Sequence, residues 1–279
     1  MIGKAIHTLL QRGNIAKAVD SLPVETNELG FDPWGLHPDR AKLYYAVASL
    51  IYRYFRPVIH GIENIPKGRV LLVGNHSGQL PFDGLVVTMA CLLHGTPPRL
   101  PRPMVERWFA VLPYINILFS RGGAVLGDPI NCRNLLEAEN AILVFPEGVK
   151  GSGKTWWHRY QLAQFGRGFM RLALQTNTPI VPVAIIGGEE SIISVYDFKP
   201  LARLLKTPYA PIPPHLFLVG LLAFWPLPVR FHIYFGEPMY FTGPFDDEDE
   251  VIDRKVKQVT DRLQKMIDDG LAKRRSVFR

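Results

Sequence analysis

One stretch decides how the chain is organised, and it reads Val70-Leu-Leu-Val-Gly-Asn-His76-Ser-Gly-Gln-Leu-Pro-Phe-Asp83-Gly84. Its apolar run, Val70 to Val73, is typical of a buried β-strand, and His76 follows it after Gly74 and Asn75. Asp83 comes after a short turn, where an apolar helical run begins. In open α/β sheets, ligands and catalytic groups gather at the carboxyl ends of strands, so His76 with a carboxylate nearby is a candidate general base. Taken alone, the stretch fits a polar turn with a helix-capping Asp83 equally well.

Apolar strands and helices alternate on both sides of this stretch. We expect strands at 70–74, 123–126, 141–145, 180–187 and 230–235, and helices at 41–55, 83–93, 105–119, 130–139 and 167–175. The acidic run 246–250 favours the start of a further amphipathic helix, because acidic side chains complement the helix dipole. The pattern predicts an α/β fold with a central, mostly parallel sheet flanked by helices.

The expected organisation is one domain overall with three parts. Residues 1–60 form an N-terminal helical segment, residues 61–245 form the α/β core, and residues 246–279 form the C-terminal amphipathic helix. The segment that joins the last two expected strands contains seven prolines, from Pro200 to Pro228 inclusive. Such a segment makes a poor helix or central strand, and we expect an apolar loop or helical hairpin that lines a cleft.

Composition narrows the class of protein. The chain has 279 residues and a net charge of +7, which suits nucleic acids, anionic membranes or phosphorylated small molecules as partners. No zinc-finger, RNP or GxxG motif accompanies that charge, so no nucleic-acid partner is expected. Cys91 and Cys132 lie far apart, with no CxxC motif and no histidine cluster, which indicates a reducing compartment and no metal site.

The expected membrane contact is peripheral or monotopic, at the membrane surface. The cleanly apolar part of the longest uncharged run, 216–229, falls short of the about 20 residues that a spanning helix needs. The first twelve residues lack the apolar core of a signal peptide. Aromatic side chains at the edges of apolar stretches suit either a membrane interface or an ordinary core.

Three further motifs follow the opening stretch. An arginine, Arg121, stands at a tight turn, Phe145-Pro146-Glu147-Gly148 follows an apolar strand, and Val181-Pro182-Val183 lies inside another. In this order and spacing, together with His76 and Asp83, they resemble the glycerolipid (lysophospholipid) acyltransferase family, 1-acylglycerol-3-phosphate acyltransferases in particular. The resemblance covers about residues 60 to 240. The chain departs from the family in placing six rather than four residues between His76 and Asp83, and in having Lys150 where an arginine is common.

The resemblance implies that the protein transfers a fatty acyl group from acyl-CoA or acyl carrier protein to a hydroxyl of a glycerolipid. His76 would be the base and Asp83 would orient its ring. Arg121, Lys150 and the turn at Gly148 would bind a phosphate. Glu147 would either contact the glycerol of the acceptor or fix the arginine.

The expected acceptor is lysophosphatidate or another lysophospholipid, with monoacylglycerol or diacylglycerol as the alternative. No cofactor is expected beside the acyl donor. The expected location is the cytoplasmic face of a membrane, held peripherally. Residues 211–229 are a candidate wall for an acyl tunnel, with plain core or a dimer contact as the alternatives.

A second interpretation competes for the glycine-rich loop. Residues 148–155 match the phosphate-loop pattern GxxxxGK[ST] and follow an apolar strand, as that motif does in nucleoside triphosphatases. No later apolar strand ends in the aspartate that would hold magnesium. A third possibility is a non-catalytic lipid-binding protein that has the same fold.

Overall fold

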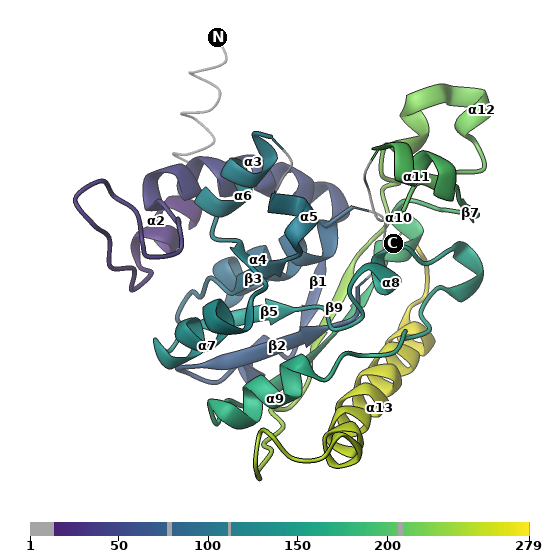
Figure 1. Ribbon diagram of the computed structural model, residues 1–279. Coiled ribbons are helices and arrows are strands. Elements are labelled where there is room, and N and C mark those ends of the chain that lie inside the picture. Colours follow the sequence, from purple (N-terminus) through teal and green to yellow (C-terminus); the bar gives the residue numbers. More distant parts are fainter. Residues whose placement is uncertain (1–13, 77–79, 111–112, 206–208, 279) are drawn as a thin grey trace.

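The computed structural model describes residues 14–76, 80–110, 113–205 and 209–278. Its centre is a seven-stranded sheet in the order β1-β9-β6-β2-β5-β3-β4 (Figure 1). The strands are β1 (Val58–His60), β2 (Val70–Gly74), β3 (Arg102–Val105), β4 (Val125–Leu126), β5 (Ala141–Val144), β6 (Ile180–Ile186) and β9 (His232–Phe235). Every pair is parallel except β6 with β9. The predicted mostly parallel α/β sheet is therefore confirmed.

The stretch that opened the sequence forms the centre of this sheet. The predicted strand over 70–74 is confirmed as β2, and all five of its residues are buried. Val70 and Leu72 pack into the core on one face of the sheet, whereas Leu71 and Val73 pack into the core on the other. A strand covered on both faces needs apolar residues at successive positions, which explains the unbroken run in the sequence.

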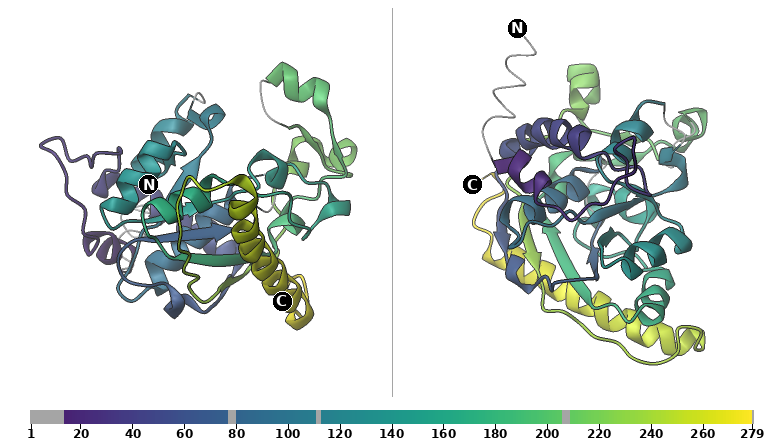
Figure 2. Two further views of the ribbon diagram at one scale, coloured as in Figure 1. Left: turned by 60° about the horizontal axis from the view of Figure 1, so that its bottom comes forward. Right: turned by 90° about the vertical axis from the view of Figure 1, so that its left-hand side faces the viewer.

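Helices cover both faces (Figures 1 and 2). The helices on one face are α2 (Asn14–Asp20), α3 (Pro38–Phe55) and α4 (Phe82–His94). The helices on the other face are α7 (Pro129–Glu137), α9 (Gly168–Gln175) and α13 (Asp249–Lys273). The expected C-terminal helix is confirmed as α13, whose fully packed side chains recur at the helical period: Ile252, Val256, Val259, Leu263 and Ile267. Residues 1–13 of the expected N-terminal helical segment lie outside the described part of the chain.

The prediction of one helix over 105–119 is wrong. The chain instead forms strand β3 and two short helices, α5 (Arg107–Ala110) and α6 (Ile115–Arg121). Pro113 cannot occupy a helix interior, because it lacks an N–H and its ring clashes with the preceding turn. Arg102 holds the strand in place, since its guanidinium bonds Asp32 at 2.6 Å and the carbonyl of Gly123 at 2.6 Å.

The proline-rich segment forms a projection at one side of the molecule (Figure 1). It contains β7 (Tyr196–Asp197), α11 (Lys199–Leu205), β8 (Pro211–Ile212), α12 (Leu216–Val219) and the 3-10 turn η3 (Gly220–Phe224). The sequence predicts an apolar loop or helical hairpin that lines a cleft, whereas the segment combines short helices with a two-stranded sheet and directs three large side chains to solvent. Leu218, Leu222 and Trp225 are 86%, 72% and 69% exposed.

The order of the strands fixes where a site can form. β5 pairs with one side of β2, and β6, the next strand of this sheet along the chain, pairs with the other side. The chain therefore passes from one side of β2 to the other between these two strands. Such a switch point leaves a crevice at the carboxyl ends of the strands, where open α/β sheets bind ligands.

The packing of α13 gives a direct test of the fold. Leu263 is fully buried, so we expect Leu263→Ala to lower the free energy of unfolding by about 2–5 kcal/mol. Lys257 lies on the same helix in an exposed ion pair with Asp261, and Lys257→Ala should cost less than about 1 kcal/mol. Urea denaturation of both variants measures the difference, and equal losses would contradict the packing of this helix.

Candidate active site

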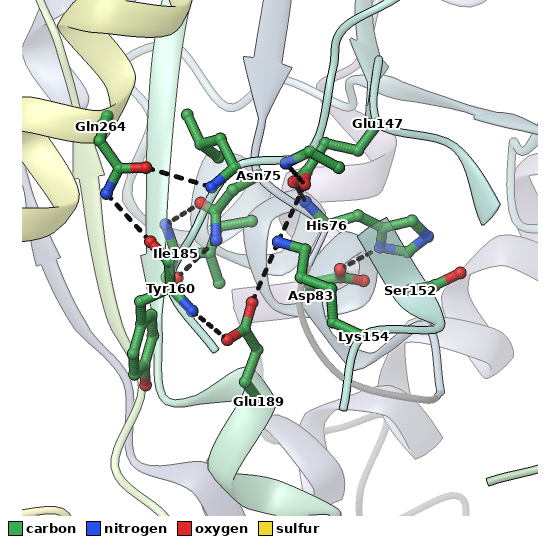
Figure 3. Close-up of polar contacts among 12 residues, drawn as sticks. Asn75, His76, Asp83, Glu147, Ser152, Lys154, Tyr160, Ile185, Glu189 and Gln264 are labelled. Carbon is green, nitrogen blue, oxygen red and sulfur yellow. Dashed lines mark hydrogen bonds and ion pairs between the residues drawn. The ribbon is translucent and has the colours of Figure 1, made fainter. Parts of the chain in front are cut away.

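His76 and Asp83 meet at the carboxyl end of β2 (Figure 3). The Nδ1 atom of His76 lies 2.6 Å from Oδ2 of Asp83. The Asp83 side chain is fully buried, whereas the His76 side chain keeps a fifth of its surface exposed. The contact with Asp83 places the proton on Nδ1, which leaves Nε2 to accept a proton. The pairing expected from the sequence is therefore confirmed as a contact.

The start of α4 explains how Asp83 reaches across the longer gap. Asp83 lies in the first turn of that helix, and its Oδ1 atom accepts the N–H of Gly84 at 2.7 Å. The N–H of Phe82 bonds the carbonyl of Leu80 at 2.7 Å, so the chain turns tightly just before the helix. Residues 77–79 of the gap lie outside the described part. The positive end of the helix dipole favours the ionised carboxylate at this position.

The groups around His76 shift the pKa of its ring and fix its orientation. Burial by itself lowers the pKa of His76, but the Asp83 carboxylate, with smaller contributions from Glu147 and Glu106, raises the pKa above its ordinary value. The ring also stacks on Phe145, with centroids 4.6 Å apart. The ring is thus held by a carboxylate at its edge and by an aromatic face, so its orientation is fixed before any substrate binds.

Glu147 does not occupy the position predicted for it. Its side chain is fully buried, and its Oε1 atom accepts the backbone N–H of His76 at 2.9 Å. Its Oε2 atom accepts the N–H of Ala163 at 2.6 Å and lies 2.9 Å from Nζ of Lys154. The predicted contact with an acceptor's glycerol or with Arg121 is therefore wrong. The turn after β5 directs this carboxylate inward, behind His76.

The three residues predicted to bind phosphate are spread along the carboxyl edge of the sheet. Arg121 ends α6 and lines an open cavity of about 550 Å³ with Val105 and Leu126, at the ends of β3 and β4. The short helix α8 (Val149–Ser152) begins directly after Gly148, and Lys150 is exposed on it. Within the described residues, no hydrogen bond or ion pair joins Arg121 to His76 or Lys150. Their role in binding stays a prediction.

The phosphate-loop interpretation does not fit the structure. In that motif the lysine and threonine open a long helix whose N-terminus cradles the phosphates. Here the helix α8 comes before Lys154 and is only four residues long. The side chain of Lys154 is 8% exposed and lies between the carboxylates of Glu147 and Glu189.

Sequence reasoning missed several residues that build the site. Asn75 joins β2 to β6, because its side chain exchanges two hydrogen bonds with the backbone of Ile185, at 2.7 and 3.0 Å. Gly151 packs closely against Glu147 and His76. A Cβ atom at this position would lie 2.6 Å from Cβ of Glu147 and 2.8 Å from Cβ of His76. Both residues lie within the motifs described above, but the presence of an asparagine or a glycine there does not indicate which groups it contacts.

The contact with Asp83 makes the pKa of His76 measurable and predictable. We expect NMR titration of the His76 ring to give a pKa above the ordinary value of about 6.5. Asp83→Asn removes the negative charge and should lower that pKa, because only the charged carboxylate stabilises the imidazolium. The exposed His158 is the internal control, and its titration should be the same in both proteins. A His76 pKa that does not change on this substitution would contradict the pairing.

Comparison with known proteins agrees with this geometry. Residues 56–186 match the family model Acyltransferase. An uncharacterized protein of Mycobacterium tuberculosis is 38% identical over 259 residues, which cover 90% of this chain and 71% of that protein. The human protein named DGAT1/2-independent enzyme synthesizing storage lipids is 23% identical, over 75% of this chain and 62% of its own length.

A solved structure shares the fold. The 1-acyl-sn-glycerophosphate (LPA) acyltransferase of Thermotoga maritima superposes with a TM-score of 0.53 at 19% identity, over 85% of each chain. The family match spans β1 to β6 and includes the His76–Asp83 pair and the Phe-Pro-Glu-Gly turn. On these grounds the chain belongs to the glycerolipid acyltransferase family and is an acyltransferase.

Proposed function

We propose that this enzyme transfers a fatty acyl group from acyl-CoA or acyl carrier protein to a hydroxyl of a glycerolipid. The observation that carries the proposal is the 2.6 Å contact between His76 and Asp83 at the carboxyl end of β2. It supplies an oriented base in the crevice of an acyltransferase fold, with Nε2 on the side of the ring away from Asp83.

The proposed reaction needs no acyl-enzyme. His76 takes the proton of the acceptor hydroxyl on Nε2 while the hydroxyl oxygen attacks the thioester carbonyl carbon. The carbon–sulfur bond then breaks, and the leaving thiolate takes that proton from His76. Asp83 stabilises the imidazolium that forms between the two steps. No other group of the protein has to gain or lose a proton.

Lysophosphatidate or another lysophospholipid is the proposed acceptor. Arg121 and Lys150 are exposed on the side of the sheet that holds His76, and a guanidinium recognises phosphate well. The Thermotoga maritima enzyme is named for an acceptor of this kind. Monoacylglycerol or diacylglycerol is the second candidate, because the human relative is named for storage lipids and the same cations suit the phosphates of CoA.

We also propose that the enzyme works at the cytoplasmic face of a membrane, bound peripherally. None of the helices in the described part combines the length and apolar content needed to span a bilayer. The projecting segment exposes Leu218, Leu222 and Trp225, and residues 207–229 contain no Asp, Glu, Lys or Arg. An apolar stretch without these charged residues, on a protein of net charge +7, suits an anionic bilayer.

Removal of the base tests the chemistry. We expect His76→Ala to lower kcat/KM by about 10²–10⁴-fold, the usual contribution of a general base. Thiol release from acyl-CoA is followed with lysophosphatidate and, separately, with monoacylglycerol, so that the preferred acceptor is measured in the same assay. His158→Ala is the control, because this histidine is exposed. Lipid binding without thiol release by the wild-type protein, or full turnover by His76→Ala, would contradict the proposal.

The projecting segment predicts how the protein binds membranes. Leu218→Ser with Leu222→Ser should weaken flotation with vesicles of phosphatidylcholine and phosphatidylglycerol by about tenfold or more, because each buried leucine contributes about 1.5–3 kcal/mol. Leu29→Ser is the matched control, since Leu29 is 76% exposed in another part of the molecule. Equal flotation of all three proteins would show that this segment does not enter the bilayer.

A further inference from the structure

Lys154, the lysine of the phosphate-loop match, lies in a buried group of charges behind His76 (Figure 3). Its Nζ atom lies 2.9 Å from Oε2 of Glu147 and 3.3 Å from Oε1 of Glu189. The side chains of the three residues are 8%, 0% and 5% exposed in the order Lys154, Glu147, Glu189. A buried carboxylate needs an ion pair or hydrogen bonds, and the ammonium group of Lys154 supplies such a contact to Glu147.

The Glu147 side chain is surrounded by donors. The N–H of His76, the N–H of Ala163 and the ammonium of Lys154 all approach its two oxygens. The two carboxylate oxygens accept all three, so the three donors together fix the position of the side chain. Loss of Lys154 therefore weakens the hydrogen bond that holds the backbone of His76.

The loop that supplies Ala163 is fixed from two other elements. Gln264 of α13 bonds the N–H of Leu162 at 3.1 Å and the carbonyl of Tyr160 at 3.0 Å. Glu189, on the short helix α10 (Gly188–Ser191) after β6, accepts the N–H of Tyr160. Burial raises the pKa of Glu189 to about 7, and its two contacts with Lys154 and Tyr160 oppose that shift. Lys154 thus links the loop after β5 to the end of β6.

Close packing transmits any shift of Glu147 to the base. Gly151 leaves no room for a Cβ atom beside Glu147 and His76. The His76 backbone is tied to Glu147, and its ring is tied to Asp83 at 2.6 Å. Movement of the backbone therefore changes the angle at which Nε2 faces the crevice. Misplacement of a catalytic group by about 1 Å can cost roughly a hundredfold in rate.

We propose that Lys154 is a positioning residue for acyl transfer, which acts by holding the Glu147 side chain in place as the acceptor for the His76 backbone N–H. The inference rests on the proposed role of His76 as the base. It assigns the glycine-rich loop a function that involves no nucleotide. The lysine acts through its charge on the protein's own carboxylate and touches neither substrate.

The test compares Lys154→Met with Lys265→Met, a control on the exposed surface of α13. We expect Lys154→Met to lower kcat by at least about tenfold while KM for both substrates stays within about twofold, because positioning affects the reacting geometry and not uniform binding. Amide hydrogen exchange at His76 should become at least about tenfold faster, since the Glu147 bond protects that N–H. The amide of Ile185, which bonds Asn75, is the internal reference.

A second variant keeps the test open if Lys154→Met does not fold. Glu147→Gln preserves the shape of the side chain, but its amide must turn a donor toward one of the three donors around it. It should show the same loss of kcat, and the double variant should lose little more than the larger single loss, because both changes act on one contact. Lys154→Arg, which keeps the charge, should recover most of the rate.

The outcomes separate this inference from the proposed function. An unchanged His76 amide, or wild-type kcat in a folded Lys154→Met protein, overturns the positioning role even when His76→Ala is inactive. Full activity of His76→Ala overturns the proposed base instead, while the exchange measurement still reports whether Lys154 holds the His76 backbone.

Discussion

The hydrogen bond between the Glu147 carboxylate and the backbone N–H of His76 is the constraint on which the site depends. It joins residues 71 positions apart in the chain, and it ties the loop after β5 to the loop after β2. β2 and β5 are parallel neighbours, so their carboxyl ends are already adjacent. The carboxylate converts that proximity into a fixed position for the histidine.

Two buried carboxylates serve His76 in different ways. Asp83 contacts the ring, lies at the start of a helix and raises the pKa of the imidazole. Glu147 contacts the backbone and forms an ion pair with Lys154. The ring and the main chain of the base are thus held by separate elements, which leaves Nε2 as the part of the histidine available to a substrate.

Much of the fold could be predicted from the sequence. Unbroken apolar runs identified β2, β5 and β6, because a strand covered on both faces needs apolar residues at every position. The helical period identified α13. The region 102–121 could not be assigned in this way, because β3 is short and is held by Arg102, whose partners Asp32 and Gly123 lie 70 and 21 residues away. The local periodicity of the sequence does not indicate partners at such distances along the chain.

The candidate site was predicted in part. The order of motifs identified His76 and Asp83, and the structure brings them into contact across the longer gap. The direction of the Glu147 side chain could not be predicted, because it follows from the turn at Gly148, whose φ of 54° sets the course of the loop.

By itself, the sequence determined which residue types stand at the ends of which strands, since that depends on hydrophobic patterning along the chain. Only the tertiary structure decided that Lys154 neutralises buried carboxylates instead of a phosphate, and that Arg121 lies apart from the histidine. The physical reason is that a charge takes its role from the groups that surround it after folding, and those groups come from distant parts of the chain.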